Sequence, residues 1–425
     1  MDRKRSGNRI ELLAPAGDLK RAQTAVLYGA DAVYLGGMKF SLRSRASNFT
    51  MDDIREACAF AHAHGSKVHV TVNMIPHDED FEGLSDYLKE LEEIGVDAFI
   101  TASPAIMKLI RECTSRVEIH CSTQMSVTNA AAANWLKETL DIDRVVLARE
   151  CSMNDVKSIT RDCLIDTEAF IHGGMCVNIS GRCTLSNRMT LRDANRGGCA
   201  QSCRWSYHLY DENREISEPG MMFTMGSKDM CAFGQIRGLI EAGVASFKIE
   251  GRMKTALYVA TVARTYRKAI DDYLESEEKY RANLDWYRSE IAKCTYRQFT
   301  TGFYFGKPDE NTQIYDNNTY VNEYIYLGIV EEIADVASAF PADTGLEAET
   351  QLVRIEQRNK FCVGDTIEIM KPSGDNVATK VEAMYNETGE PVESCPHSKQ
   401  LIWLKLSEIP EKYDLLRVKN FEEVK

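Results

Sequence analysis

The first 275 residues alternate short apolar stretches with segments in which apolar positions recur every three or four residues. The apolar stretches have the length of β-strands, and the segments that follow them have the period of amphipathic helices. The predicted strands cover residues 10–17, 32–37, 67–73, 98–102, 117–124, 144–150, 167–173 and 245–251. Eight strand–helix units in about 250 residues, at spacings that suit parallel pairing, predict a closed (β/α)8 barrel.

A doubly wound open sheet is the alternative α/β architecture. Such a sheet usually has fewer strands, and its dinucleotide-binding forms carry a glycine-rich fingerprint after the first strand. The stretch APAGD at 14–18 does not match that fingerprint, and the chain has no P-loop motif. We therefore expect the barrel.

The pattern changes after the barrel. Residues 276–320 look like a charged helix followed by an irregular arm. Residues 321–425 contain β-rich runs separated by turn residues, with no strong helical period. The predicted fold is therefore an α/β TIM-like barrel over residues 1–275, a helical arm, and a small C-terminal β-barrel domain.

The 425-residue chain has a globular composition, with 44% hydrophobic and 27% charged residues. It has no uncharged apolar run long enough to span a bilayer, and its basic start lacks the apolar core of a secretory signal. The thirteen cysteines are odd in number and scattered, unlike a secreted disulfide framework. We therefore expect a cytoplasmic protein that does not bind membranes.

The net charge of −13 argues against a protein that coats nucleic acid with its whole surface. Residues 172–208 nevertheless contain five arginines and one acid, which gives this segment a local charge of +4. The segment is either a solvated loop or an anion-binding site.

Much of this basic segment lies in a long predicted loop, residues 174–231, between strand seven and its helix. The usual connection has about 2–6 residues, and much longer loops in compact domains usually serve a function. Barrel chemistry lies on the loops that follow the strands. The loop carries five cysteines, namely Cys176, Cys183, Cys199, Cys203 and Cys231. Inert buried cysteines belong on strands and helices, so these thiols predict a metal site.

Two kinds of metal centre compete for these thiols. Structural zinc sites typically use close pairs of cysteines, and only Cys199 and Cys203 approach that spacing. The wide spacing of the set favours an iron–sulfur cluster wrapped by a long loop. Cys231 opens a predicted helix over residues 231–243, whose N-terminal dipole would stabilise a thiolate.

The stretch EAFIHGGMCVNISGRCTLS, from Glu168 to Ser186, carries a specific signature. It combines Glu-x-Phe, a glycine and a cysteine, Gly-x-Cys after four more residues, and an aliphatic residue before serine. In this pattern the sequence resembles peptidase family U32, with a departure at Gly174, where serine or alanine is usual. The stretches at 197–205, 227–231, 247–254 and 299–306 and the terminal β-rich region are similar to the family as well.

The resemblance implies a chemistry that differs from the family's name. Members were labelled collagenase-like proteases, whereas better-understood relatives carry a 4Fe–4S cluster and take part in oxygen-independent hydroxylation of RNA or quinone precursors. Members with a comparable barrel and β-domain resemble the proteins that convert the wobble uridine of tRNA to 5-hydroxyuridine, with prephenate as the hydroxyl source. The implied partners are therefore the tRNA anticodon region and prephenate.

By position, the resemblance implies that the cluster ligands are Cys176, Cys183, Cys199 and Cys231. We prefer Cys231 to Cys203 because a helix start would stabilise its thiolate and would fasten the end of the loop. A helical turn at 199–203 would favour Cys203, and zinc remains the alternative metal.

The residues themselves disfavour a peptidase. The chain has no H-E-x-x-H and no G-x-S-x-G motif. His120 and Cys121 are adjacent on a predicted strand, so their side chains point to opposite faces and cannot form a dyad. A non-catalytic iron–sulfur scaffold in an RNA-modifying complex is a third possibility, and a second copy or a paralogue as partner is left open.

Polar residues at the predicted strand ends form the expected mouth of the barrel. The candidate catalytic residues are His120, His172, Lys248, Glu250 and Arg252. The candidate substrate-binding residues are Asn73, Gln124, Arg182, Arg188, Arg192 and Arg196. Lys248, Arg252 and the loop arginines would suit a dicarboxylate or RNA phosphate. The last three arginines are spaced by four, so a helix would align them, and their mutual repulsion would be relieved by an anion.

Overall fold

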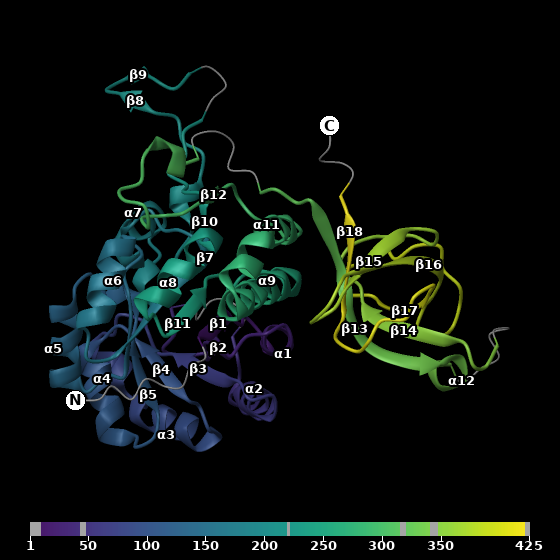
Figure 1. The fold of residues 1–425 in the computed structure, drawn as a ribbon, viewed down its shortest axis with the longest axis horizontal. Helices are drawn as coiled ribbons and strands as arrows, with labels where there is room; N and C mark the ends of the chain where they lie inside the picture. The colour runs from purple at the N-terminus through teal and green to yellow at the C-terminus, as the bar shows by residue number, and fades with distance from the viewer. Residues whose placement is uncertain (1–9, 43–47, 219–221, 315–319, 341–346, 421–425) are drawn as a thin grey trace. The chain divides into compact units, whose positions relative to one another are not determined.

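The computed structural model describes residues 10–42, 48–218, 222–314, 320–340 and 347–420. Eight parallel strands form a barrel, which closes because the last strand pairs with both the first and the seventh (Figure 1). The barrel strands are β1 (Glu11–Pro15), β2 (Ala32–Leu35), β3 (Lys67–Thr71), β4 (Ala98–Thr101), β5 (Glu118–Cys121), β6 (Arg144–Val146), β7 (Asp166–Gly174) and β11 (Ser246–Ile249). Each overlaps a predicted strand, so the predicted barrel is confirmed.

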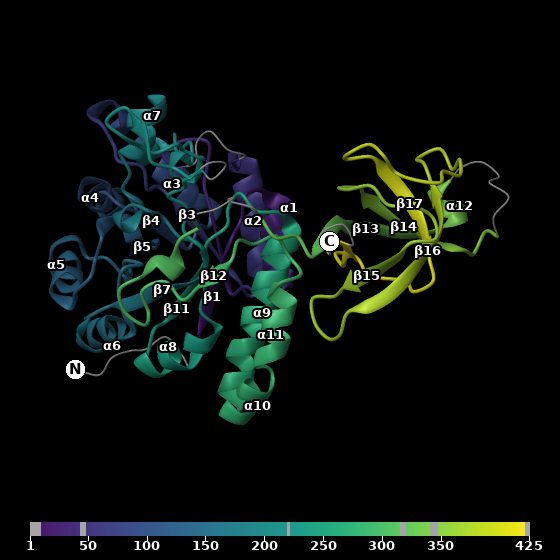
Figure 2. The same ribbon diagram turned by 90° about the horizontal axis from the view of Figure 1, so that it is seen from above.

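Helices surround the strands, as Figure 2 shows from above. They are α1 (Leu19–Leu27), α2 (Met51–Ala63), α3 (Leu84–Ile94), α4 (Pro104–Cys113), α5 (Ala130–Leu140), α6 (Met153–Asp162), α8 (Ile236–Ala242) and α9 (Ala256–Glu275). Polar caps fix several starts, because their side chains bind backbone N–H groups that have no partner within the helix. Thr50 and Asp53 form a capping box on α2, and Ser152 and Asp155 form one on α6. No helix in the described part of the chain is long and apolar enough to cross a membrane.

The long cysteine loop is folded back onto the barrel sheet. Behind β7 the chain forms α7 (Leu185–Thr190) and a hairpin of β8 (Tyr210–Asp211) and β9 (Arg214–Glu215), and returns through β10 (Asp229–Cys231). β10 pairs antiparallel with the end of β7, and β12 (Phe299–Thr300) pairs with β10. Figure 1 shows α7, the hairpin, β10 and β12 at the same end of the barrel.

The predicted helix over residues 231–243 is wrong at its start. Cys231 is the last residue of β10, a short 3-10 turn covers Phe233–Gln235, and α8 begins only at Ile236. Three residues are too few for a strand to show its alternation in sequence, so the apolar residues that follow suggested a longer helix.

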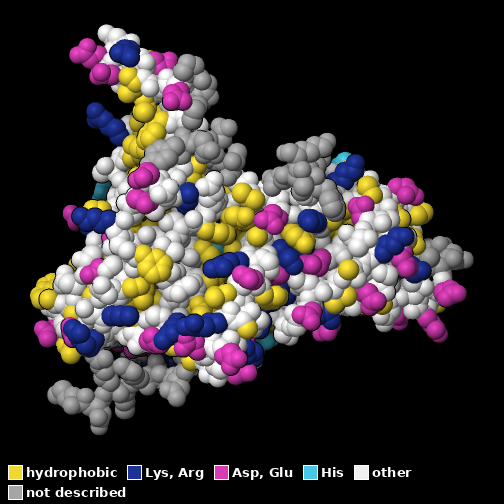
Figure 3. All heavy atoms as spheres, turned by 45° about the horizontal axis from the view of Figure 1, so that its top comes forward, with side chains coloured by type: hydrophobic (Ala, Val, Ile, Leu, Met, Phe, Trp, Pro, Cys, Tyr) yellow, Lys and Arg dark blue, Asp and Glu magenta, His cyan; other side chains and the backbone are white. Residues whose placement is uncertain are grey.

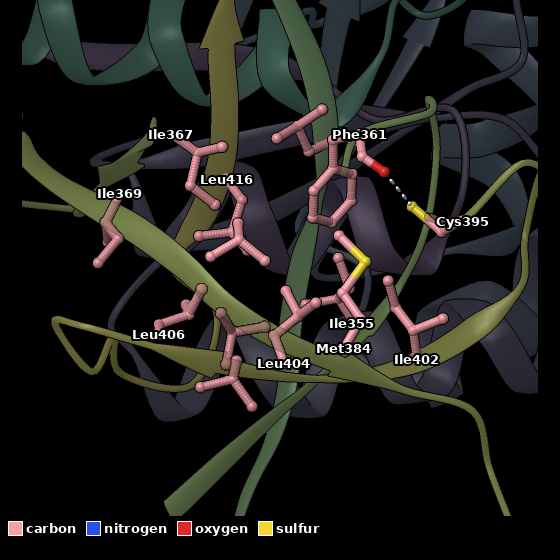
Figure 4. Close-up of a cluster of buried hydrophobic side chains, with 14 residues drawn as sticks. Ile355, Phe361, Ile367, Ile369, Met384, Cys395, Ile402, Leu404, Leu406 and Leu416 are labelled. Atoms are coloured by element: carbon pink, nitrogen blue, oxygen red, sulfur yellow. Dashed lines mark hydrogen bonds between the residues drawn. The ribbon is translucent and has the colours of Figure 1, made fainter. Parts of the chain in front are cut away.

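The second compact unit comprises residues 289–295 and 321–425. Its six strands form a closed antiparallel barrel, which confirms the predicted β-barrel domain. They are β13 (Tyr324–Asp335), β14 (Gln351–Glu356), β15 (Thr366–Met370), β16 (Val377–Tyr385), β17 (Leu401–Leu406) and β18 (Leu415–Lys419), with the short helix α12 (Val336–Ala339) after β13. Side chains from all six strands, among them Ile355, Met384 and Leu416, meet in the core shown in Figure 4.

Most of the predicted arm at 276–320 belongs to the first compact unit, together with the (β/α)8 barrel. It contains α10 (Glu277–Ala282) and α11 (Leu284–Ile291), and residues 296–320 cluster with the (β/α)8 barrel. β12 belongs to this segment and extends the barrel sheet. Residues 315–319 lie outside the described residues.

The interior of the (β/α)8 barrel holds a chain of ion pairs. Arg144 bonds Glu11 at 2.5 Å and Glu168 at 3.3 Å, and Lys248 bonds the other oxygen of Glu168 at 2.7 Å. Burial would raise the pKa of Glu168, but the charges of Lys248 and Arg144 outweigh this and lower it. Glu168 therefore needs both cations as partners for its buried charge.

We expect Arg144→Met to lower the free energy of unfolding by about 3–5 kcal/mol, because it leaves two carboxylates in the barrel without this cation. Arg161→Met is the control, since Arg161 is exposed on α6 and pairs with its neighbour Asp162. Urea unfolding followed by circular dichroism measures both variants. Equal midpoints for the two variants would show that the interior chain of ion pairs does not hold the barrel.

Candidate functional site

Four cysteines of the loop form one group. Burial raises the pKa of the Cys176 thiol, and the neighbouring Cys183 and Cys199 raise it further. The pKa of the Cys203 thiol is raised by burial and by the same neighbours together with Cys176. Cys203 thus lies with Cys176, Cys183 and Cys199 at the end of the barrel. All thirteen cysteines are free thiols.

Side-chain hydrogen bonds from the loop itself hold these cysteines in place. Asn195 clamps Cys183 at both backbone groups: its Oδ1 accepts from the Cys183 N–H at 3.1 Å, and its Nδ2 donates to the Cys183 carbonyl at 3.0 Å. The Ser186 hydroxyl donates to the Gly198 carbonyl at 3.3 Å and accepts from the Ala200 N–H at 2.9 Å. The two bonded residues, Gly198 and Ala200, lie on either side of Cys199. The turns that carry Cys183 and Cys199 are therefore fixed by side-chain hydrogen bonds of the loop itself.

The loop is also tied to the barrel rim. Glu150, just after β6, accepts hydrogen bonds from the backbone and the hydroxyl of Ser180 at 2.8 and 3.0 Å. Arg196 forms an ion pair with Asp80 and donates to the Ile75 carbonyl at 3.3 Å. These ties hold the cysteine group against the ends of β3 and β6.

Cys231 lies apart from this group. It pairs with His172 across β10 and β7, and both side chains contact Tyr266 of α9, on the outside of the barrel. Tyr266 donates a hydrogen bond to the Cys231 sulfur at 3.8 Å, and burial raises the pKa of this thiol to about 11. The expected stabilisation of a Cys231 thiolate by a helix start is therefore wrong, because no helix starts there.

The donor chemistry of the four-cysteine group suits an iron–sulfur cluster. The protein ligands of such a cluster are cysteine thiolates, which are stabilised by hydrogen bonds and nearby positive groups. A backbone hydrogen bond from Asn178 and the charge of Arg149 act on Cys176, and the charge of Arg204 acts on Cys203. Among the described residues, no three His, Cys, Asp or Glu side chains are already gathered as metal ligands. Binding would therefore require the thiols to close on the cluster.

The predicted catalytic residues are split between the barrel interior and its outside. Lys248 points inward, bonds Glu168 and lies 4.7 Å from the ring centre of Tyr34. Arg252 is also buried and donates to polar side chains, namely Ser41, Thr71 and Asn48. Glu250 is half-buried at the end of β11, with a carboxylate oxygen 3.6 Å from the ideal Cβ position on Gly174.

Both predicted histidines are buried, and His172 lies beside Cys231 on the neighbouring strand. His120 is fully buried in the barrel and bonds Glu118 at 2.9 Å, and burial lowers its pKa well below the usual value. His172 faces α9, with its ring 5.5 Å from that of Tyr266, and burial lowers its pKa to about 3. Both side chains are buried, His120 in the barrel interior and His172 against α9, so neither lies in the mouth as expected.

The smaller polar candidates have structural partners or are enclosed. The Asn73 side chain accepts a hydrogen bond from the Leu42 backbone at 3.2 Å. Gln124 is buried just after β5, and its side-chain oxygen has no partner among the described residues. Gln124 therefore remains a candidate, whereas Asn73 supports the turn after β2.

The arginines do not form the expected helical row. Helix α7 ends at Thr190 because Leu191 adopts a left-handed conformation with φ of 56°. Arg196 is engaged by Asp80, so only Arg188 and Arg192 remain exposed near the helix end. Arg182 is exposed too and reaches the sulfur of Met125 at 3.8 Å.

Apolar side chains interleave with these exposed arginines. They are Val177, Ile179, Met189 and Leu191, of which Leu191 is 94% exposed. We call these four residues together with Arg182, Arg188 and Arg192, all exposed residues of the loop, the loop face. Sequence reasoning found its charges but missed its apolar part, because isolated apolar residues in an irregular segment have no period.

An important ion pair was also missed. Asp229 of β10 and Arg297, which follows α11, bond at 2.6 Å, and both side chains are only 2% exposed. The pair fastens the returning end of the loop to the segment that forms β12. The two residues lie far apart in sequence in unremarkable surroundings, so no local pattern indicates them.

Comparison with known proteins identifies the family. The model of "Peptidase family U32" matches residues 17–314, and that of the "Peptidase family U32 C-terminal domain" matches residues 342–417. The chain belongs to peptidase family U32. Among U32 relatives, tRNA hydroxylation protein P1 of Bacillus subtilis is 40% identical, over 93% of this chain and 92% of that protein.

Two further U32 relatives show how varied the names in this family are. The tRNA hydroxylation protein P of Escherichia coli is 31% identical, over 97% of this chain and 97% of that protein. A protein of Porphyromonas gingivalis named collagenase is also 31% identical, over 89% of this chain and 91% of that protein. Similarity over the whole chain therefore links the U32 fold to RNA hydroxylation and to a peptidase name alike.

Proposed function

We propose that this protein takes part in hydroxylating tRNA: the wobble uridine of the anticodon becomes 5-hydroxyuridine without oxygen, and prephenate supplies the hydroxyl group. The observation that carries the proposal is the full-length similarity to two tRNA hydroxylation proteins, at 40% and 31% identity. The arginine-rich loop at the barrel end supports it, because RNA needs a local positive surface on an acidic chain.

The proposed cofactor is a 4Fe–4S cluster held by Cys176, Cys183, Cys199 and Cys203. Cys203 replaces Cys231 in the expected ligand set because it lies with the other three thiols, whereas Cys231 contacts α9. When bound, a cluster with four thiolate ligands has no open iron and supplies electron transfer. Structural zinc on the same thiols is the alternative.

The chain's own residues would bind and orient the substrates. Sequence-specific RNA recognition uses unpaired bases, which are splayed out and packed against apolar or aromatic groups while cations bind the phosphates. The loop face offers both kinds of group, with three arginines among four apolar side chains. Inside the barrel, the buried ion pair of Lys248 and Glu168 gives a fixed charge arrangement that needs no reorganisation.

A peptidase is the second candidate, favoured by the relative named collagenase. The adjacent Cys121 and His120 do not support it. Both are fully buried, the Cys121 sulfur contacts the Ser122 carbonyl, and burial raises the pKa of Cys121 to about 12. A thiol nucleophile needs the thiolate form and access to substrate, and Cys121 has neither. A non-catalytic iron–sulfur scaffold, the third possibility, would need the same RNA-binding surface and would differ from the proposed enzyme only in lacking activity.

Deleting the gene in its host should remove most 5-hydroxyuridine and its derivatives from tRNA, because the proposal assigns the hydroxylation step to this protein. Mass spectrometry of tRNA nucleosides measures the loss, and re-expression of the wild-type chain should restore the modification. An unchanged nucleoside profile in a host without a paralogue would argue against hydroxylation and for the peptidase.

Cys203→Ser should lose most of the iron and visible absorbance of anaerobically purified protein, whereas Cys231→Ser should retain both. The reason is that Cys203 lies with the other three thiols and Cys231 faces α9. Iron analysis and absorbance spectra compare the two matched variants. The reverse result would mean that β10 rearranges on cluster binding, and stoichiometric zinc in place of iron would contradict the cluster itself.

Replacing both Arg188 and Arg192 by glutamine should weaken tRNA binding and reduce its salt dependence. Each lost phosphate contact lowers the slope of log Kd against log salt by roughly 0.7–0.9. Fluorescence anisotropy at several salt concentrations measures the slope, with Arg161→Gln on α6 as the control. An unchanged slope, or loss of iron from the double variant, would assign these arginines a role other than phosphate contact.

A further inference from the structure

The hairpin arm, which we define as residues 208–218 around β8 and β9, leaves its side chains exposed. Its base is tied to the loop, since Tyr207 and Phe223 exchange backbone hydrogen bonds at 2.7 and 2.8 Å. Beyond this base every residue from 208 to 216 is exposed, and β8 and β9 form a two-stranded sheet of their own. Figure 1 shows both strands standing away from the barrel. A two-stranded hairpin is only marginally stable in water unless one of its faces packs against something else.

The hairpin arm presents apolar side chains on both faces. Ile216 donates its backbone N–H to the Leu209 carbonyl at 2.9 Å, so these two residues lie opposite each other and their side chains share one face. Tyr210, which pairs with Glu215, lies on the other face and is 59% exposed. Exposed apolar groups with a polar rim are typical of a surface that binds another protein.

The charge of the hairpin arm is opposite to that of the loop face. The arm has four acids and one arginine, which gives it a net charge of −3. They are Asp211, Glu212, Arg214, Glu215 and Glu218. The loop face carries three exposed arginines among four exposed apolar residues. The two surfaces are therefore complementary, because acids would meet arginines and apolar groups would meet apolar groups.

The loop face is a local surface of the folded loop. Its residues fall in two runs, 177–182 and 188–192, which are held close by the hydrogen bonds between Asn195 and the Cys183 backbone. The second run places two arginines and two apolar residues within five positions at the end of α7. A single arm of matching charge can therefore contact several of these side chains at once.

The hairpin arm and the loop face of one chain do not cover each other. Ile179 of the loop face is 69% exposed, and Ile216 of the arm is 54% exposed. We propose that the arm docks on the loop face of a second copy of this chain, and that two copies exchange their arms. Because each copy has one arm and one loop face, the exchange closes a pair with twofold symmetry, the commonest symmetry of soluble oligomers.

Reciprocal exchange gives the interface an adequate size. Each copy contributes the eleven residues of its arm and the seven residues of its loop face. A standard protein interface has roughly 20–30 residues on each side, so the reciprocal pair comes close to this size whereas a single docked arm falls well short. Docking also gives the exposed arm a surface to pack against, which a two-stranded hairpin needs.

Reversing the charge of each surface tests the contact between copies. Glu212→Lys with Glu218→Lys changes the charge of the arm to +1. Arg188→Glu with Arg192→Glu changes that of the loop face to −1. Like charges then meet in either double variant, so its dimer dissociation constant should rise roughly tenfold or more. An equimolar mixture of the two variants should dimerise again, because a basic arm meets an acidic loop face while the unaltered arm and loop face meet as before.

Sedimentation velocity measures these masses on protein purified anaerobically, without RNA and at low salt. Restoration by mixing also shows that each double variant is folded. Glu93→Lys with Glu138→Lys is the matched control, since these exposed acids of α3 and α5 give the same change of net charge away from the arm, and it should dimerise like the wild type.

Three outcomes overturn the proposal. One is a wild type that stays monomeric at roughly 100 μM, well above the micromolar affinity of weak specific interfaces. Another is a mixture of the reversed variants that stays monomeric. The third is a control that loses the dimer as well, which would assign association to net charge and not to the arm.

The consequence for RNA rests on the proposed function, because a docked arm covers the arginines that would bind tRNA. Leu209→Ser with Ile216→Ser removes apolar contact without changing charge, so this variant should be monomeric. It should bind tRNA about threefold more tightly under conditions where two thirds of the wild type is dimeric. Fluorescence anisotropy measures the affinity. An unchanged tRNA affinity in the monomeric variant overturns the competition and the proposed RNA site, whereas the dimer is decided without RNA.

Discussion

The pairing of β10 with the end of β7 is the constraint on which the cysteine loop depends. It brings Asp229 opposite Gly174, so the start and the end of a loop of more than fifty residues meet in one sheet. The buried ion pair of Asp229 with Arg297 then fastens the returning strand to β12. The entropy cost of closing a long loop grows only slowly with its length, so a few good bonds at its ends suffice. The ends of the loop are thus fixed in the sheet, and ties such as Glu150 to Ser180 and Asp80 to Arg196 fix its interior.

The chain of ion pairs inside the barrel serves a different purpose from stability alone. Buried pairs of this kind contribute little compared with a well-packed apolar core, because both charges lose their hydration. Strands β1, β7 and β11 contribute Glu11, Glu168 and Lys248, and β6 contributes Arg144, which links the two carboxylates. The charged groups inside the barrel therefore hold one another in fixed orientations. A site that stabilises changing charge benefits from such fixed surroundings, since no energy is then spent on reorganising them.

The sequence predicted periodic features well and three-dimensional pairings poorly. Eight strands were found because each is a short apolar run followed by a helical period, and this pattern survives without tertiary information. Cys231 was misplaced because a three-residue strand has no detectable alternation. His172 was expected in the mouth, but the register shift between Lys248 and Ile249 where β11 pairs with β7 accompanies its outward orientation. The partners of Arg196 and Arg297 lie 116 and 68 residues away, and no local rule identifies such pairs.

Charge is distributed unevenly along the cysteine loop of this acidic chain. The net charge of −13 would repel a polyanion at long range, but salt reduces the range of such forces to about 8 Å. What matters is therefore the surface within a few ångströms of the approaching phosphate. The β8–β9 hairpin carries exposed acids at Asp211, Glu212 and Glu215, and Figure 3 shows acidic side chains at the end of a projection with apolar side chains along it. The loop face carries Arg182, Arg188 and Arg192, so under the proposed function this contrast within one loop would direct RNA to the cysteine site and away from the hairpin.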